Sequence, residues 1–232
     1  MAGAGGDGWS HSGVLPVEQA GELAQLFAGY FDRAGMNSRD IQIWVSNVAG
    51  EEVARHIRNI SSGGLPRFVV AQEMQCGVRN GYASAAQLGS DRWVALIAAW
   101  HRVRSECLVV NCGTATTIDA LSGHGEFLGG LILPGIELMQ RSLCDATAQL
   151  QLHEGKYAPF PLNTADALLS GAIQASCGAI ERQHALLGDS TAPVLLGGGA
   201  AALLQPRLNL PIQMMDNPVL QGLLLIAQEA GA

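Results

Sequence analysis

The chain has 232 residues, of which 48% are hydrophobic and 14% are charged, and its formal net charge is −7. A chain of this length and composition can bury a real core, as one large domain or two small ones, and is not expected to be disordered over most of its length. The acidic balance argues against a protein that binds nucleic acid through its phosphates. No apolar run approaches the length of a membrane span.

Cysteine usage points to a reducing compartment. Five cysteines without CxxC spacing, and an opening Met1–Gly8 segment with neither the basic flank nor the apolar stretch of a signal peptide, predict a cytoplasmic protein with reduced thiols. We expect all five thiols to be small core residues and the opening segment to be a flexible loop. The six histidines have no ligand spacing, so no zinc site is predicted. The cysteines are Cys76, Cys107, Cys112, Cys144 and Cys177.

The first half of the chain is predicted to follow the order α-β-α-β-α. The spacing of apolar residues predicts a helix over 16–34 and another that starts at Asp91. The elements between them are a strand over 41–48, a short helix over 51–57, a strand over 68–71 and a Gly- and Asn-rich loop over 75–82.

The second half is predicted to follow the order β-β-β-α-α-β-α-β-α. A three-stranded meander followed by helices and strands is typical of a ribonuclease-H-like domain. That fold usually has one more strand between its first two helices, and the sequence places none there. The predicted strands are 107–112, 115–121, 126–133, 193–196 and 212–215, and the main helices are 136–150, 165–187 and 218–228.

This order predicts an α/β protein of the actin-like fold, in which two ribonuclease-H-like subdomains clamp ATP between them. The C-terminal subdomain is expected over residues 105–232. The N-terminal one, over residues 1–104, matches only the tail of the pattern, with its first meander missing. In the actin-like fold the turn of that meander receives phosphate.

The segment Leu88–Arg92 is the first that could carry chemistry. Gly89 lets the backbone approach a ligand, and either Ser90 or Asp91 could cap the helix that follows. A carboxylate at a helix N-terminus stays ionised and can accept a proton from a hydroxyl, while Arg92 can pair with an anion. The alternative is an ordinary capping aspartate with a solvent-exposed arginine, and the segment taken alone favours that reading.

The segment Asn111–Asp119 offers a Gly113-Thr114 turn between two strands. Its amides and hydroxyl suit an oxyanion such as phosphate. The alternative is a hairpin whose threonines serve strand propensity. The small residues at the turn favour ligand contact slightly.

Three further segments are rich in glycine. Paired glycines at a strand end in Gly129–Gly135 allow close packing or close approach of a ligand, and the turn in Leu196–Ala200 resembles those found beneath an adenine or ribose. Arg, Asn and Tyr in Gly77–Tyr82 could bind a small polar substrate. Structural turns are the commoner explanation for each, and neither GxGxxG nor a Walker sequence is present.

Taken together and in order, these segments resemble the type III pantothenate kinase family, from about residue 42 to the C-terminus. The residues that carry the resemblance are Gly77–Tyr82, Gly89–Arg92, Gly113–Thr116, Gly129-Gly130 with Pro134-Gly135, Thr147–Leu150, Asn163-Thr164, Gly171, Gly197–Gly199 and Val219–Leu223.

The resemblance implies ATP-dependent phosphorylation of pantothenate to 4′-phosphopantothenate, the first step of coenzyme A biosynthesis. It implies that Asp91 is the base that takes the proton from the pantothenate hydroxyl, and that Thr114 contacts ATP. It further implies Mg²⁺ with the nucleotide, a monovalent cation (K⁺ or NH₄⁺), and a homodimer whose substrate pocket lies close to the subunit interface. The residues that it implies for pantothenate binding are Tyr82, Gly89, Ser90, Asp91, Arg92 and Thr164.

Two departures from the family pattern bear on activity. Family members open with a strand and an Asp-x-Gly-Asn-Thr-like turn that binds ATP phosphates, and nothing like it occurs before Gly8-Trp9. The chain is therefore expected to phosphorylate pantothenate feebly or not at all. The family also commonly has an acidic cation ligand where this chain has Asn111, whose amide oxygen can coordinate potassium but adds no charge.

Two other functions stay open. One is a non-catalytic accessory or regulatory protein that keeps the kinase fold, which pantothenate binding without ATP binding would support. The other is an actin-like phosphotransferase for a sugar or an acid. The Asp91 segment suits that reaction too, whereas Tyr82 and Thr164 fit pantothenate better, and a substrate panel separates the two.

Overall fold

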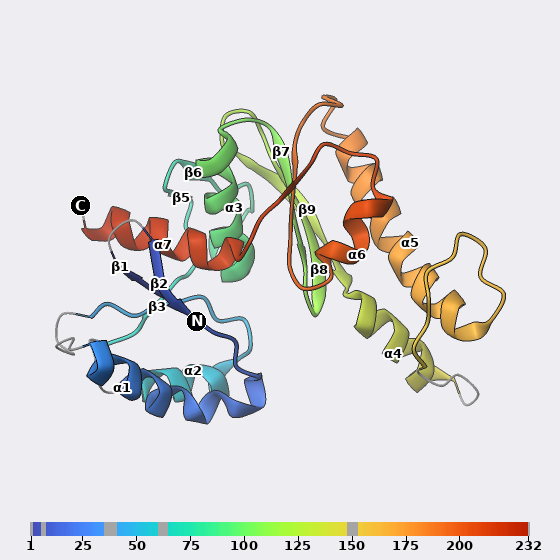
Figure 1. The fold of residues 1–232 in the computed structure, drawn as a ribbon. Coiled ribbons are helices and arrows are strands. Elements are labelled where there is room, and N and C mark those ends of the chain that lie inside the picture. The colour runs from blue at the N-terminus through green and yellow to red at the C-terminus, as the bar shows by residue number, and fades with distance from the viewer. Residues whose placement is uncertain (1, 6–7, 35–40, 60–64, 148–152, 232) are drawn as a thin grey trace. The chain divides into compact units, whose positions relative to one another are not determined.

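The computed structural model describes residues 2–5, 8–34, 41–59, 65–147 and 153–231 (Figure 1). The chain forms two compact units, which are described one at a time. The first comprises residues 1–76, 84–98 and 219–232, and the second comprises residues 77–83 and 99–218. The predicted division of the chain after residue 104 stays a prediction.

A five-stranded sheet forms the centre of the second unit. Its order is β11-β10-β7-β8-β9, with β7, β8 and β9 antiparallel and with β10 and β11 parallel to β7. The predicted meander is therefore confirmed, and β7 and β8 have the predicted bounds. The strands are β7 (Cys107–Cys112), β8 (Ala115–Leu121), β9 (Phe127–Pro134), β10 (Val194–Gly197) and β11 (Ile212–Met214).

Helices cover one face of this sheet. Alternate residues of β7, such as Leu108 and Val110, point to one face. There they join a buried cluster that includes Ile173, Ile180 and Leu204 of the helices. Among the described residues between α4 and α5 there is no strand, and the predicted end of α4 at residue 150 lies outside the described residues. The helical elements are α4 (Ile136–Ala146), α5 (Thr164–Ala185), α6 (Ala201–Leu204) and the 3₁₀ turn η4 (Gln205–Arg207).

A β-bulge places the paired glycines inside β9. The register between β8 and β9 shifts at Ala120/Leu121, and Gly129 has φ +127°, a backbone conformation that favours glycine. The predicted strand over 126–133 is confirmed within one residue at each end. The description of Gly129 and Gly130 as a strand end is wrong, because β9 continues through them to Pro134.

The strands of the first unit are short. The expectation of a loop over Met1–Gly8 is wrong for residues 2–5 and 8, because β1 (Ala2–Gly5) and β2 (Gly8–Ser12) pair as an antiparallel hairpin. The predicted strands over 41–48 and 68–71 shrink to two residues each, because β3 and β4 share only two residue pairs. These are β3 (Trp44–Val45) and β4 (Arg67–Phe68), and two more two-residue strands follow, β5 (Met74–Gln75) and β6 (Val78–Arg79).

The helix α3 contributes a continuous run of buried residues, from Arg92 to Ala98, to the first unit. Trp93, Leu96 and Ile97 are completely buried. A Cβ atom added at Gly222 of α7 would lie 1.9 Å from the carbonyl oxygen of Val94, so the two helices pack backbone to backbone. The helices of this part are η1 (Val17–Glu22), α1 (Leu23–Ala34), α2 (Glu51–Arg58), α3 (Ser90–Val103) and α7 (Pro218–Gly231).

The cysteines do not all lie in the core. Cys107, Cys112 and Cys177 are buried, as predicted, and burial raises the pKa of the Cys107 and Cys112 thiols to about 12. The prediction is wrong for Cys76 and Cys144, which are partly exposed.

Thiol alkylation tests this division. We expect iodoacetamide at neutral pH to modify Cys144 well before Cys107 and Cys112, because buried thiols with a raised pKa form little thiolate. Peptide mass spectrometry after short pulses gives the order. The urea-unfolded chain, in which all five thiols should react at similar rates, is the control. Early labelling of Cys107 or Cys112 in the folded protein would contradict their burial.

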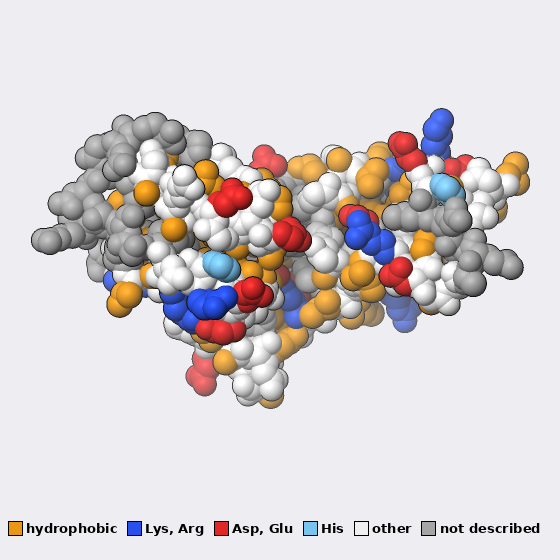
Figure 2. Space-filling model, turned by 90° about the horizontal axis from the view of Figure 1, so that it is seen from below, with side chains coloured by type: hydrophobic (Ala, Val, Ile, Leu, Met, Phe, Trp, Pro, Cys, Tyr) orange, Lys and Arg blue, Asp and Glu red, His pale blue; other side chains and the backbone are white. Residues whose placement is uncertain are grey.

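The described surface carries mixed charge. On the face shown in Figure 2, Lys and Arg side chains of the described residues lie beside Asp and Glu side chains and do not merge into one basic area. Within the described part of the chain, every helix is too short or too polar to cross a lipid bilayer.

Candidate active site

Asp91 lies in the first turn of α3. The helix begins at Ser90, and the Asp91 Oδ1 atom accepts the backbone N–H of Arg92 at 2.8 Å. This N–H is one of the amides that a helix start leaves without an internal partner, and the helix dipole favours negative charge there. The half-buried Asp91 side chain is thus held at the positive end of a helix, where a carboxylate can act as a proton acceptor.

Gly89 makes room for this carboxylate. A Cβ atom at this position would lie only 2.7 Å from Asp91 Oδ1 and 3.8 Å from Cγ1 of Val48. Any larger residue would force the Asp91 side chain to turn away.

Arg92 is buried, with 5% of its surface exposed. The alternative reading, an arginine in solvent beside an ordinary capping aspartate, is wrong on this point. A buried guanidinium is costly unless it is paired and hydrogen-bonded. Arg92 is therefore part of the polar interior next to Asp91, where a guanidinium can bind an anion through two parallel hydrogen bonds.

In the second unit, Thr114 occupies the turn between β7 and β8. The turn is closed by the N–H of Gly113, which donates to the carbonyl of Ala115 at 3.0 Å. The N–H of Gly135 donates to the Thr114 carbonyl at 2.8 Å, and a Cβ atom at Gly135 would lie 2.2 Å from the Gly113 oxygen. The start of α4 therefore packs directly against the turn.

The glycine turn after β10 meets the same place. Gly198 has φ +92°, and a Cβ atom there would lie between 2.5 and 2.7 Å from backbone atoms of Cys112. The Cys112 carbonyl accepts the N–H of Ala200 at 3.1 Å. The structure thus brings Gly135 and the turn at 198–200 together around Gly113-Thr114. The paired Gly129 and Gly130 lie opposite Ala120 and Asp119, away from this turn.

Side chains near this turn differ in exposure. Thr114 is exposed, whereas Thr116 and Thr117 are buried, so Thr114 is the hydroxyl of this stretch that a ligand in solvent can reach. Asn111 is half-buried and lies opposite Thr117 and Gly197 in the sheet register.

Tyr82 lies at the N-terminal end of β9, where it contacts Phe127. Its ring packs on Phe127 with 5.4 Å between ring centroids, and its N–H donates to Asn80 Oδ1 at 3.0 Å. Phe127, which Tyr82 contacts, is at the start of β9, whereas Pro134 at its end pairs with Ala115, the residue after Thr114. Tyr82 and Thr114 therefore lie roughly 20 Å apart along β9. The second unit does not bring these two residues together.

Thr164 opens α5. Asn163 caps this helix by accepting the Asp166 N–H at 2.9 Å. The pKa of Asp166 is lowered by the hydrogen bond from the Lys156 N–H and then by that from Asn163. Thr164 lines a groove of about 420 Å³ between α4 and α5, whose other lining residues are mainly apolar.

The predicted residues therefore fall into separate places. Gly89, Ser90, Asp91 and Arg92 form one cluster in the first unit. In the second unit Asn111 and Thr114 share one turn region, and Tyr82 and Thr164 lie elsewhere. One residue that the sequence reading missed contacts the first cluster: the Ser46 hydroxyl lies 2.8 Å from the Ser90 hydroxyl. No motif marks Ser46, and the predicted strand over 41–48 contained it, so the sequence held no signal that points to this residue.

Comparisons with known proteins bear on the resemblance. A family model described as "Type III pantothenate kinase" matches residues 8–185. A type III pantothenate kinase from Nitrosospira multiformis is 50% identical over 218 residues, which is 89% of this chain and 83% of that protein. A type III pantothenate kinase from Aromatoleum aromaticum is 43% identical over 230 residues, which is 98% of this chain and 92% of that protein.

Solved structures agree on the fold. A conserved putative Baf family transcriptional activator from Campylobacter jejuni has a TM-score of 0.55 and 24% identity, with 82% of this chain and 83% of that chain covered. A putative 2-dehydro-3-deoxygalactonokinase from Sinorhizobium meliloti has a TM-score of 0.51 and 14% identity, with 92% and 88% covered. At such identities the likeness is one of fold alone, and the predicted α/β class of actin-like type is confirmed. The predicted resemblance is confirmed as well: the chain belongs to the type III pantothenate kinase family.

Proposed function

We propose that this chain transfers the γ-phosphoryl group of ATP to pantothenate and forms 4′-phosphopantothenate, the first step of coenzyme A biosynthesis. One observation carries the proposal: the Asp91 carboxylate is held at the N-terminus of α3 beside a buried arginine. The relatives named above, which are pantothenate kinases by name, support the same reaction. Cytoplasmic location is part of the proposal.

In this reaction Asp91 accepts the proton of the pantothenate hydroxyl as that oxygen bonds to the γ-phosphorus, and the bond from phosphorus to ADP breaks. Phosphoryl transfer asks a protein mainly for positioning and for neutralisation of charge. Arg92 pairs with the pantothenate carboxylate. Gly89 and Ser90 bind pantothenate from the same turn of the first unit. The assignment of Tyr82 and Thr164 to pantothenate binding rests on the family resemblance alone and stays a prediction.

Thr114 contacts ATP. Support comes from its exposure at a turn on which two glycine segments pack, since such a turn presents backbone amides and a hydroxyl. Mg²⁺ accompanies the nucleotide. It is commonly held by substrate phosphates with one or two carboxylates. Among the described residues no group of three or more His, Cys, Asp or Glu could hold a metal ion, which agrees with an ion that arrives with ATP.

The monovalent cation, K⁺ or NH₄⁺, is assigned to the side-chain oxygen of Asn111. Asn111 is half-buried and pairs with Gly197 of the neighbouring strand β10. Neutral amide and carbonyl oxygens are donors that suit potassium. The Asn111 oxygen therefore suits a monovalent cation, which it would hold weakly because it carries no negative charge.

The protein acts as a homodimer in this proposal, with the substrate pocket close to the subunit interface. The groove between α4 and α5 supports it, because its lining is largely apolar and includes Thr164. A second copy that covered the groove would bury this surface and bring Thr164 close to an interface.

A substrate panel tests the function. The purified chain is incubated with Mg·ATP, K⁺ and one acceptor at a time: pantothenate, a hexose or a sugar acid. We expect ADP and a phosphorylated product, identified by mass, with pantothenate alone. The feeble activity expected from the sequence stays a prediction, which the rate of product formation tests. Phosphorylation of a sugar or sugar acid in its place would contradict the proposal. Pantothenate binding by calorimetry with no nucleotide binding and no product would instead support a non-catalytic accessory protein.

A further inference from the structure

We propose that Ser46 is a positioning residue for phosphoryl transfer, whose hydroxyl fixes the first turn of α3 and thereby the Asp91 carboxylate. The inference rests on the proposed function, in which Asp91 is the base. All the contacts that carry it lie within the first unit.

The central contact joins two hydroxyl groups. Ser46 directly follows β3, and its Oγ atom lies 2.8 Å from the Oγ atom of Ser90. Ser90 is the first residue of α3, is 7% exposed and precedes Asp91. The bond therefore ties the end of a strand to the helix start that carries the carboxylate. Loss of one hydroxyl would leave the buried Ser90 position without this partner, which buried polar groups tolerate poorly.

The loop after Ser46 reaches the same turn by a second contact. A Cβ atom at Gly89 would meet Cγ1 of Val48 at 3.8 Å on one side and Asp91 Oδ1 at 2.7 Å on the other. Val48 of the loop and the Asp91 carboxylate thus lie on either side of the small space next to Gly89. A shift of the loop changes the room that the carboxylate has.

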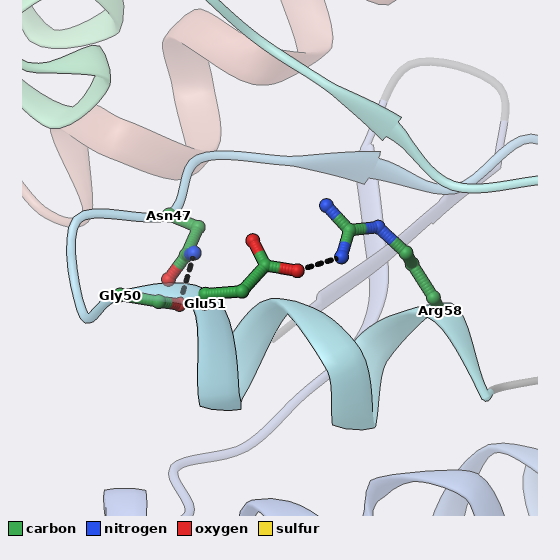
Figure 3. Close-up of polar contacts among 4 residues, drawn as sticks. All are labelled: Asn47, Gly50, Glu51 and Arg58. Carbon is green, nitrogen blue, oxygen red and sulfur yellow. Dashed lines mark hydrogen bonds and ion pairs between the residues drawn. The ribbon is translucent and has the colours of Figure 1, made fainter.

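The loop is braced internally (Figure 3). The Asn47 side chain accepts the N–H of Ala49 at 3.1 Å and donates to the carbonyl of Gly50 at 2.9 Å. Gly50 has φ +92° and precedes α2, in which the carboxylate of Glu51 pairs with Arg58 (Figure 3). A loop closed on itself in this way can hold Ser46 in a fixed place.

The other side of the turn has its own anchor. The indole N–H of Trp93 donates to Gln75 Oε1 at 2.9 Å, and the Trp93 side chain is completely buried. In the sequence, Asp91 lies between Ser90, which contacts Ser46, and Trp93. Since Trp93 holds the helix in place, loss of the Ser46 hydroxyl should alter the orientation of the first turn and not the existence of the helix.

Replacement of Ser46 tests the inference. We expect Ser46→Ala to lower kcat about 10- to 100-fold, because a displacement of about 1 Å at a reacting group costs this much. The KM for pantothenate should change much less. Ser46→Thr keeps the hydroxyl and should restore most of kcat. The control is Thr191→Ala, which removes an exposed hydroxyl that donates to Asp189 at 2.7 Å in the second unit and should leave kcat unchanged.

A double-mutant cycle separates positioning from general damage. At saturating pantothenate, Ser90→Ala should lower kcat as much as Ser46→Ala, and the kcat of the double variant should equal that of either single variant, because all three lack the same bond. The KM for pantothenate should rise only in the variants that lack the Ser90 hydroxyl, because Ser90 also binds the substrate. Wild-type kcat in Ser46→Ala, or losses that multiply in the double variant, would overturn the inference.

A measurement without turnover keeps this test apart from that of the proposed function. Amide hydrogen exchange of residues 89–94 should be faster in Ser46→Ala, with exchange in α5 unchanged, whatever the enzyme phosphorylates. Unchanged exchange at 89–94 would refute the positioning role. If instead Asp91→Asn kept full kcat while Ser46→Ala exchanged faster, the proposed role of Asp91 would fail and the bond to Ser90 would stand.

Discussion

Replacement of Asp91 by asparagine is expected to lower kcat for pantothenate phosphorylation by about 10²- to 10⁴-fold, the usual contribution of a general base. Asparagine keeps the shape of the side chain and an oxygen that can accept the Arg92 N–H, so the start of α3 should persist. Because asparagine cannot take a proton, pantothenate binding should survive while the chemical step is lost. Steady-state kinetics and calorimetry with pantothenate give the two quantities.

Two further variants sharpen this result. Gly89→Ala places a methyl group 2.7 Å from Asp91 Oδ1 and should lower kcat by turning the intact carboxylate away. Glu52→Gln removes an exposed carboxylate from the first turn of α2 and should leave kcat unchanged. Activity in Asp91→Asn equal to that of the wild type would remove the base from the mechanism.

The second large effect is expected at Gly198. Gly198→Ala combines a φ of +92° with a Cβ atom 2.5 Å from the Cys112 carbonyl oxygen. Backbone strain and overpacking each cost about 1 to 3 kcal/mol, so the melting temperature should fall by roughly 5 to 15 °C for a chain of this size. The KM for ATP should rise as well, because Cys112 adjoins the Gly113-Thr114 turn. Differential scanning calorimetry and ATP titrations measure the two effects.

The neighbouring glycine provides a matched control. A Cβ atom at Gly199 would meet no atom within 4 Å, so Gly199→Ala should leave the melting temperature within a few degrees of the wild type. Equal melting temperatures for the Gly198→Ala and Gly199→Ala variants would show that the turn is not closely packed.

The second unit was the more predictable part of the fold. The strands β7 and β8 are apolar runs ended by Gly113 and by the Ser122–Gly125 turn, so hydrophobicity and turn residues define their bounds together. The bulge at Gly129 was not predictable, since two glycines in a strand indicate either an end or an irregularity.

The first unit was less predictable because its strands depend on partners and not on side-chain pattern. Residues 41–48 have the apolar content of a full strand, yet only Trp44 and Val45 have a partner in β4. The first strand of the N-terminal hairpin, β1, consists of Gly and Ala alone and so carries little side-chain signal. Tertiary pairing decides such segments.

Of the candidate site, the sequence identified the residue types but not their surroundings. Asp91 and Arg92 were found from a helix start and from family resemblance. The burial of Arg92 was not visible in the sequence. Neither was the bond from Ser46 to Ser90, because it joins residues 44 positions apart. The meeting of three glycine segments at Thr114 was likewise a consequence of the sheet order.

A crystal structure of the chain with pantothenate, Mg²⁺ and a non-hydrolysable ATP analogue tests the central claim most directly. The account predicts an Asp91 carboxylate oxygen about 2.6 to 3.2 Å from the pantothenate hydroxyl, with that hydroxyl facing the γ-phosphorus. A pantothenate hydroxyl bound beyond the reach of Asp91, with another group as its proton acceptor, would contradict it.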